Sequence, residues 1–533
     1  MKFIHYLGLF LLSGLILTGG SYFQRSPGYM DAEYYFAGSM RLFQGHGFSE
    51  VILWNYLDDP AGVPHPAFGY WMPLTSLVGL IPLAGFPLAG FMGVKLFFGL
   101  LAALISPLTA GWTNKLTGRK DWAILAGCLA IFPGFYLPYL STSDTFGICM
   151  LLGLAWFFLA SRQSGWLSRS QAGWFDNHTY LLLGMTSGMF HLARAEGLIW
   201  LFLSLSVVLL QRERYRTGDF KSSSALRDML KIGLGYLIVM GPWMGRNLIV
   251  FGSPFSPGGG RAFWLTSYDE LFAYPAGQLT LSHWWNSGLV EILKTRMWAF
   301  GQNLQTAGVV QGEIILLPLV LMSLWRNKGQ LVYQTATLAW LGLIIIMTVF
   351  FPFQGARGGF FHAGAALQPL IWFSTPIGLD QFVKWGGRAR GWNAAQAFSI
   401  FGVAIVILAA FITTSVLSKR VIGKDWMAPV WNRAAEDYQQ AADYLNTLGV
   451  RPDEVVMANN PPGFFLASGL PVIVIPNESV ERLLETAHRY QARYLVIDNN
   501  HPQPLHAVYL HPQDQPGLNL LVKIKAMLIF QIQ

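Results

Sequence analysis

Charged residues are scarce in this chain of 533 residues. Only 12% of the residues are Asp, Glu, Lys or Arg, whereas 53% are hydrophobic. Soluble domains carry about 25% charged residues, so the composition excludes one large soluble enzyme. Apolar stretches near the roughly 20 residues of a membrane-spanning helix recur along the chain. The sequence therefore predicts a polytopic α-helical membrane protein.

Cysteine is nearly absent as well. The two cysteines, Cys128 and Cys149, both lie within apolar segments. They offer no spacing for a disulfide framework or a metal site, and they are better interpreted as small buried hydrophobic residues.

The formal net charge of +8 does not make nucleic acid a partner, because the basic residues gather in short loops between apolar segments. About eleven spans are predicted, at residues 4–22, 88–111, 122–140, 144–160, 179–193, 197–210, 231–250, 312–325, 332–351, 363–379 and 396–417. The basic loops then fall on one side, which the positive-inside rule makes cytoplasmic. These loops are 115–120, 162–169, 212–231, 326–328 and 384–390.

One apolar segment, 67–86, is interpreted differently. It is apolar enough to cross a membrane, but it contains Pro73, Pro82 and several glycines. Counting it as a span would place every later basic loop outside. We therefore expect a re-entrant or interfacial element within a large outer loop.

The composition changes after Val416. Short apolar runs in "EVVMANN", "PVIVIP" and "RYLVIDNN" predict buried strands, and the spacing in "ESVERLLETAHRYQ" predicts a helix. This alternation indicates a small α/β domain, which the odd number of spans places outside the cell membrane. We thus expect a membrane domain, 1–417, with outer loops 23–87 and 252–311, and an extracytoplasmic α/β domain, 418–533, in a plasma-membrane protein.

Ionisable residues collect at the predicted outer ends of the spans. Such residues are costly near a bilayer, and they usually face a cavity, pair with each other or mark a functional pathway. Their gathering on one side predicts a polar cavity at the outer leaflet. The candidates are Asp31, Glu33, His65, Asp144, Arg194, Glu196, Arg246, Arg357 and His362.

Most of these candidates also have a structural interpretation. Asp31 and Glu33 could cap the helix that "AEYYFAGSMRLF" predicts, and Asp144 could cap the next span. Arg194 and Glu196 could neutralise each other, Arg246 could satisfy helix-terminal carbonyls, and His65 could shape the turn before Pro66.

The order of these features resembles the GT-C superfamily of polyprenyl-phosphate-dependent glycosyltransferases, near its protein mannosyltransferase and aminoarabinose transferase branches. The resemblance rests on the acidic stretch "MDAEYYFAGSMRLFQGHGF", the stretch "HPAFGYWMPLTSL", an "SDT" helix start, "ARAEGL" and "PWMGRN". Here "HPA" replaces the double proline of the family, which leaves the role of His65 open. No "WWDYG" box is present, which argues against an oligosaccharyltransferase acting on asparagine.

The resemblance implies an enzyme that moves a hexosyl or pentosyl group, with inversion, from a polyprenyl-phosphate donor to a hydroxyl of an acceptor lipid, glycan or protein. It implies Asp31 as general base beside Glu33, and a donor phosphate bound by Arg194, Arg246, Arg357 and His362. Asp31 and Asp144 would hold a divalent ion, Mg²⁺ or Mn²⁺, if the enzyme needs one. His65 and Glu196 are further candidates.

Two other functions remain open at this point. A transporter or flippase could move a glycolipid without reacting it, although internal repeats and broken spans are not evident. A polymerase or ligase could use a lipid-diphosphate donor instead of a monophosphate.

Overall fold

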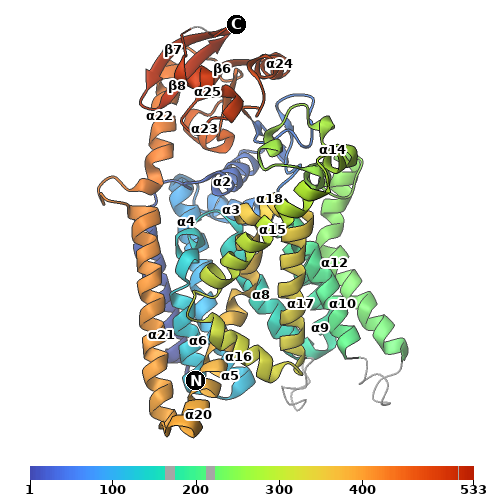
Figure 1. The fold of residues 1–533 in the computed structure, drawn as a ribbon, viewed down its shortest axis with the longest axis vertical. Coiled ribbons are helices and arrows are strands. Elements are labelled where there is room, and N and C mark those ends of the chain that lie inside the picture. The colour runs from blue at the N-terminus through green and yellow to red at the C-terminus, as the bar shows by residue number, and fades with distance from the viewer. Residues whose placement is uncertain (163–173, 212–221, 514) are drawn as a thin grey trace. The chain divides into compact units, whose positions relative to one another are not determined.

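The computed structural model describes residues 1–162, 174–211, 222–513 and 515–533 (Figure 1). It divides into two compact units, which we call unit 1 and unit 2. Unit 1 comprises Met1–Tyr22, Lys95–Arg246 and Thr295–Val421, and unit 2 comprises Phe23–Val94, Asn247–Lys294 and Ile422–Gln533. Parts of the predicted basic loops 162–169 and 212–231 lie outside the described residues.

Unit 1 is helical, as its long apolar runs predict. The helices that lie wholly or partly in it are α1 Phe3–Ser21, α4 Gly90–Ala103, α5 Ile105–Thr117, α6 Lys120–Ile131, α7 Leu137–Leu140, α8 Thr145–Arg162, α9 Trp174–Ala193, α10 Ile199–Leu210, α12 Ser222–Phe251, α15 Leu289–Gln305, α16 Leu317–Asn327, α17 Leu331–Ile345, α18 Pro352–Gln354, α19 Phe360–Gly364, α20 Gln368–Arg390 and α21 Ala394–Leu417. Short 3₁₀ and π-helical segments interrupt this series, among them the 3₁₀ helix η4 Ala195–Leu198 and the π-helical η10 Gly355–Gly359 and η12 Ser418–Ile422.

Several helices are long and apolar enough to cross a membrane, so the protein is membrane-embedded. Among the described residues six helices meet this criterion, or seven if the pair Lys120–Ile131 and Gly134–Leu140, bent by 41°, is one span. The count of about eleven spans is not confirmed, because several predicted spans are shorter helices such as α10 and α16. The six are Phe3–Ser21, Pro87–Thr117, Thr145–Arg162, Ser224–Phe251, Leu331–Phe350 and Ala394–Ile422.

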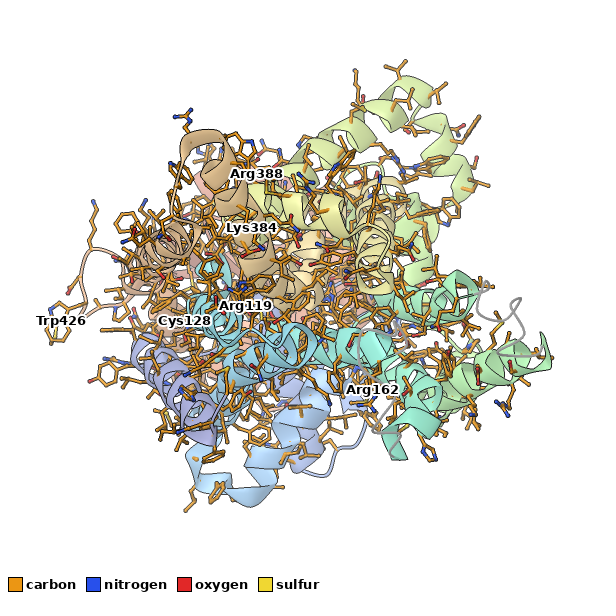
Figure 2. The ribbon with its side chains drawn as sticks, turned by 90° about the horizontal axis from the view of Figure 1, so that it is seen from below. Arg119, Cys128, Arg162, Lys384, Arg388 and Trp426 are labelled. Carbon is orange, nitrogen blue, oxygen red and sulfur yellow. The ribbon has the colours of Figure 1, made fainter. Side chains whose placement is uncertain are left out.

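Described basic residues from all five predicted cytoplasmic loops belong to unit 1. Figure 2, a view from below, labels Arg119, Arg162, Lys384 and Arg388. Arg119 also interacts electrostatically with Asp380, one turn before Lys384 on α20. The first and last of these loops therefore lie at one end of the bundle.

Unit 2 is built around a six-stranded sheet with the order β2-β5-β4-β6-β8-β7. The first four strands are parallel, and β8 and β7 continue the sheet in antiparallel fashion. The predicted strands correspond to β4 Val455–Ala458, β5 Val472–Val474 and β6 Ala492–Ile497, and the predicted helix to α24 Val480–Tyr490. The remaining C-terminal elements are α22 Arg433–Thr447, α23 Pro461–Ser468, α25 His506–Leu510, β7 Leu518–Ile524 and β8 Met527–Ile532.

The first loop contributes directly to this sheet. Strand β2, Ile52–Leu53, pairs in parallel with Val472–Ile473 of β5, so unit 2 is larger than residues 418–533. Segment 67–86 forms α3, Leu74–Gly85, which is a short apolar helix rather than one of the six long ones. Other elements of unit 2 are α2 Met30–Phe43, β1 Ser49–Glu50, β3 His65–Pro66, α13 Pro257–Arg261 and α14 Leu281–Asn286.

Candidate functional site

Asp144 and His362 meet within unit 1, although 217 residues separate His362 from the first residue of α8. The imidazole Nδ1 of His362 lies 3.7 Å from Oδ1 of Asp144 and 3.2 Å from the hydroxyl of Thr145. That hydroxyl also donates to Oδ1 of Asp144 over 3.1 Å, and the same oxygen accepts the backbone N–H of Thr145. The "SDT" helix start thus supplies a buried carboxylate that is oriented at the beginning of α8.

Close packing of α8 against the turn after α19 makes this meeting possible. A Cβ atom at Gly153 would lie 1.9 Å from the carbonyl oxygen of Ala366, so only glycine lets the two segments approach so closely. About two turns earlier on α8, the ring of Phe146 stacks on His362 with centroids 4.0 Å apart. His362 and Asp144 are 8% and 1% exposed, which shields their interaction from water.

Arg194 and Glu196 form an ion pair between Nε and Oε1, as one of the structural interpretations predicted. Their side chains are only 15% and 10% exposed, so this is not a solvated surface pair. Gly197 allows η4 to fold back on the end of α9, because a Cβ there would lie 2.2 Å from the carbonyl oxygen of Phe190. Arg194 also interacts electrostatically with His362. The pair therefore belongs to the same region of unit 1 as Asp144.

Arg246 and Arg357 lie on other elements of unit 1. The guanidinium of Arg246, on α12, sits over the ring of Trp243 at 4.8 Å from its centroid. Arg357 is exposed at a kink in η10, where its own backbone is non-helical and Gly358 has a φ of 124°. That these two cations converge on Asp144 and His362 stays a prediction.

Asp31 and Glu33 belong to unit 2 and occupy the first turn of α2. Two residues on an α-helix are about 200° apart around its axis, so their side chains leave α2 on nearly opposite sides. Glu33 is 2% exposed, and its Oε2 accepts a hydrogen bond of 2.7 Å from Nδ2 of Asn460. Burial raises the pKa of Glu33 to about 7, although the bond from Asn460 lowers it. Glu33 thus joins α2 to α23, while Asp31 is half-buried on another side.

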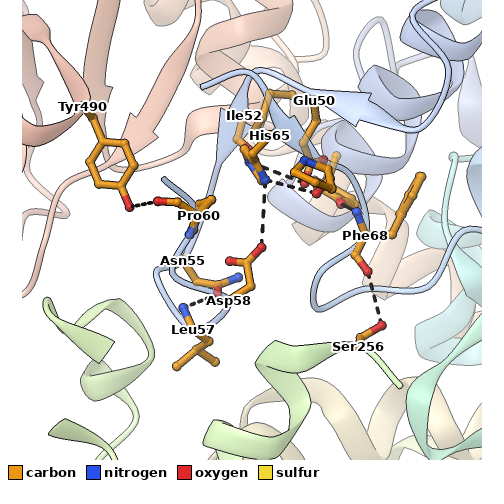
Figure 3. Close-up of polar contacts among 12 residues, drawn as sticks. Glu50, Ile52, Asn55, Leu57, Asp58, Pro60, His65, Phe68, Ser256 and Tyr490 are labelled. Atoms are coloured by element: carbon orange, nitrogen blue, oxygen red, sulfur yellow. Dashed lines mark hydrogen bonds and ion pairs between the residues drawn. The ribbon is translucent and has the colours of Figure 1, made fainter. Parts of the chain in front are cut away.

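His65 is surrounded by groups of its own loop (Figure 3). Its ring nitrogens lie 3.1 Å from the carbonyl oxygens of Ile52 and Pro66, and 3.7 Å and 3.9 Å from the carboxylates of Glu50 and Asp58. Glu50 and His65 are also directly paired in the two-stranded sheet β1-β3. Burial lowers the pKa of His65, and Asp58 opposes this shift. These contacts hold the loop together.

Sequence reasoning missed one cation of unit 1. Arg420, in η12, interacts electrostatically with Tyr139, which interacts in the same way with Asp144. The sequence contained a signal for this residue. Lys419 and Arg420 directly follow the last predicted span on its outer end, where the positive-inside rule makes basic residues uncommon.

Comparisons with known proteins give structural likeness only. No protein-family profile and no curated protein matches the sequence. Among solved structures, ArnT from Cupriavidus metallidurans bound to undecaprenyl phosphate has 11% sequence identity and a TM-score of 0.56, and the match covers 99% of this chain and 98% of ArnT.

The oligosaccharyltransferase AglB from Archaeoglobus fulgidus is also similar. Its complex with an inhibitory peptide and a dolichol-phosphate has 12% identity and a TM-score of 0.56, over 93% of this chain and 69% of AglB. Its complex with Zn and sulfate has the same identity and TM-score, over 92% and 68%. The chain therefore has the fold of the GT-C glycosyltransferases.

Proposed function

We propose that the chain is an integral-membrane glycosyltransferase that moves a sugar from a polyprenyl-phosphate donor to an acceptor hydroxyl. The observation that carries the proposal is the buried cluster of Asp144, Thr145 and His362 beside Arg194, because ionisable groups that converge from distant helices are typical of a site. The fold supports it, since the likeness to ArnT runs over nearly the whole of both chains. The AglB match covers a smaller share of that chain, in keeping with the missing "WWDYG" box.

Asp31 is the proposed general base. A carboxylate within hydrogen-bond reach of the acceptor hydroxyl would take its proton as the oxygen attacks the anomeric carbon. The bond from the sugar to the phosphate breaks in the same displacement, so the configuration inverts. Glu33 would assist by holding α2 through Asn460 rather than by touching the acceptor.

The departing phosphate needs positive charge rather than a proton donor. Fixed cations in a site poor in water stabilise such developing charge best. We assign this role to Arg194, Arg246 and Arg357, since a guanidinium can bond two phosphate oxygens at once. The ion pair with Glu196 occupies Nε of Arg194 and orients the rest of that guanidinium. His362 would add a further donor.

A divalent ion fits the chemistry of part of this site. Asp144 and His362 present a carboxylate oxygen and an imidazole nitrogen 3.7 Å apart, both buried. This pair of ligand types suits Mn²⁺ better than Mg²⁺, which prefers oxygen alone. Asp144 and His362, joined by Asp31, would hold the ion, which would supply positive charge next to the donor phosphate.

The proposed topology follows the sequence. About eleven spans in the plasma membrane would place unit 1's basic loops in the cytoplasm and the C-terminal α/β domain outside. Donor and acceptor could then meet at the outer membrane surface, where the polyprenyl tail remains in lipid.

The test is sugar transfer by the purified full-length protein and its Asp31→Asn variant. We expect transfer from a lipid-monophosphate sugar and a loss of about 100-fold or more in Asp31→Asn, which is the usual contribution of a general base. Asp453→Asn, at an exposed acid of unit 2, is the matched control and should leave the rate unchanged. Use of lipid-diphosphate donors alone, movement of glycolipid without reaction, or normal activity of Asp31→Asn would each contradict the proposal.

A further inference from the structure

Unit 2 contains a pocket that none of the proposed catalytic residues lines. Its volume is about 320 Å³, at the lower end of the range for small-molecule sites. The pocket lies where the end of α2 meets α23 and the residues before β4 and β5. Its lining consists of Met40, Arg41, Gln44, His46, Val51, Pro452, Phe465, Leu466, Gly469 and Pro471.

Arg41 provides a fixed positive charge in this lining. Its side chain is 8% exposed, and its Nε donates a hydrogen bond of 2.8 Å to the carbonyl oxygen of Ser49. That bond holds the guanidinium in place and leaves the terminal nitrogens, with four N–H donors, for other partners. Among the residues that the structure describes, none is hydrogen-bonded to these terminal nitrogens.

The end of α2 brings His46 to the same pocket. The backbone N–H of His46 donates to the carbonyl oxygen of Arg41 over 3.0 Å, which folds the chain back over the last turn of the helix. Gly45, with a φ of 83°, and Gly47, with a φ of 62°, supply the left-handed conformations that this reversal needs. The Gly-His-Gly turn therefore brings exposed His46 into the same pocket lining as Arg41, together with Gln44.

The positive charge of the pocket is not cancelled by its own lining, which includes no acidic residue. Outside the lining, the carboxyl of Glu50 interacts electrostatically with Arg41. Glu50 is buried at 7% exposure, and burial raises its pKa well above the ordinary value. A neutral carboxyl at this position leaves the charge of Arg41 available to a ligand.

We propose that this pocket binds an anionic group of monosaccharide size, a phosphorylated sugar or a uronic acid. The guanidinium and imidazole match a phosphate or carboxylate, and the apolar side chains of Phe465, Leu466 and Val51 suit the C–H face of a sugar ring. This assignment rests on the proposed function: the anionic sugar group is part of the acceptor, because the proposed donor-phosphate ligands all belong to unit 1.

Direct binding to the full-length protein in detergent, without donor or turnover, tests the pocket by itself. The probes for titration calorimetry are glucuronate, glucose 6-phosphate, glucose and inorganic phosphate. We expect saturable binding of one or both anionic sugars, and at least about 10-fold weaker binding of glucose and of inorganic phosphate. The two anionic probes separate a carboxylate ligand from a phosphate ligand. Equal binding of inorganic phosphate, or no saturable binding of either anionic sugar, would overturn the proposal.

Three variants locate the binding. His46→Ala removes an exposed side chain and should weaken binding about 10-fold, whereas His488→Ala, at an exposed histidine of α24, should not change it. Leu466→Trp fills the pocket while keeping Arg41, and it should abolish binding. Unchanged affinity in His46→Ala and Leu466→Trp would place the ligand elsewhere and refute the pocket.

Steady-state kinetics test separately whether the pocket binds the acceptor. Once an acceptor is in hand, Leu466→Trp should raise its KM and leave kcat with saturating acceptor within about threefold. An unchanged KM in a variant that no longer binds the probes would refute the acceptor assignment alone. Failure of the transferase proposal would instead appear as absence of transfer in the wild-type protein.

Discussion

His65 in unit 2 and His362 in unit 1 are both buried beside carboxylates, but their partners come from different parts of the chain. His65 and His362 are 6% and 8% exposed, and each has a carboxylate oxygen within 3.9 Å. The partners of His65 lie between residues 50 and 66 of one loop, whereas the partners of His362 come from the start of a helix more than two hundred residues earlier. Contacts within one loop stabilise that loop, but polar groups gathered from distant helix ends need another reason to meet.

The largest expected effect in this comparison of the two histidines comes from His362→Phe. The aromatic ring keeps the stack on Phe146 and removes both nitrogens, so the fold should survive. We expect transfer to fall about 100-fold, because the proposed phosphate donor and metal ligand is lost, while the thermal unfolding temperature changes little. Rates with saturating donor and unfolding followed by intrinsic fluorescence measure the two quantities. A large loss of stability with a normal rate would make His362 a structural residue like His65.

The same substitution at the other histidine should give the opposite result. His65→Phe removes the ring nitrogens that lie 3.1 Å from the carbonyl oxygens of Ile52 and Pro66 in a buried loop. We expect a loss of about 2–4 kcal/mol in the free energy of unfolding, with the rate per folded molecule within about threefold of wild type. Denaturant titration of the detergent-solubilised protein, with His488→Ala as control, measures the loss. Full stability with an abolished rate would give His65 a catalytic role after all.

The sequence predicted several elements of unit 2, but it did not predict the contacts between segments that are far apart in the chain. The strands β4, β5 and β6 were predictable because buried parallel strands appear as short apolar runs. Strand β2 was not, since its two residues, Ile52 and Leu53, are too few to carry a pattern, and its partner is some 420 residues away. The bond of Glu33 to Asn460 spans 427 residues, and no local spacing indicates it.

The candidate residues were found because charge is rare near a bilayer, and that scarcity is a property of the sequence. Which candidates meet was not predictable, because it depends on how helices pack. Gly153 lets α8 approach the segment of His362, yet in the sequence it is one glycine among 56.

The stability of the folded protein should depend on pH through Glu50, the buried acid next to His65, but not through exposed acids. Burial raises the pKa of Glu50 in the folded protein, so the folded state holds this proton more tightly than the unfolded state. The stabilisation is complete below the unfolded pKa of about 4.3 and is lost as pH rises towards the folded pKa, by up to about 1.4 kcal/mol per pH unit. Glu50→Gln keeps the neutral form at every pH, so it should match the wild type near pH 4 and be more stable near pH 7.

The measurement is the unfolding temperature of both proteins across this pH range. Glu436→Gln, at an exposed acid of α22, should follow the wild type throughout. Parallel curves for Glu50→Gln and wild type would show that Glu50 is ionised in the folded loop. An ionised Glu50 would then offset part of the positive charge that Arg41 gives to the anion-binding pocket.

The smallest effect on transfer is expected at Glu33, which α2 directs to nearly the opposite side from Asp31. Glu33→Gln retains an oxygen that can accept the bond from Asn460, so we expect transfer within about threefold of wild type, against about 100-fold or more for Asp31→Asn. Asn460→Ala removes the donor to Glu33 and the side-chain cap of α23, and should cost about 1–2 kcal/mol of stability. In the double variant Glu33→Ala with Asn460→Ala, the stability losses of the two single variants should not add, because the residues share one bond. Additive losses, or a rate in Glu33→Gln as low as in Asp31→Asn, would return Glu33 to the reacting groups and make the first turn of α2 a two-carboxylate site.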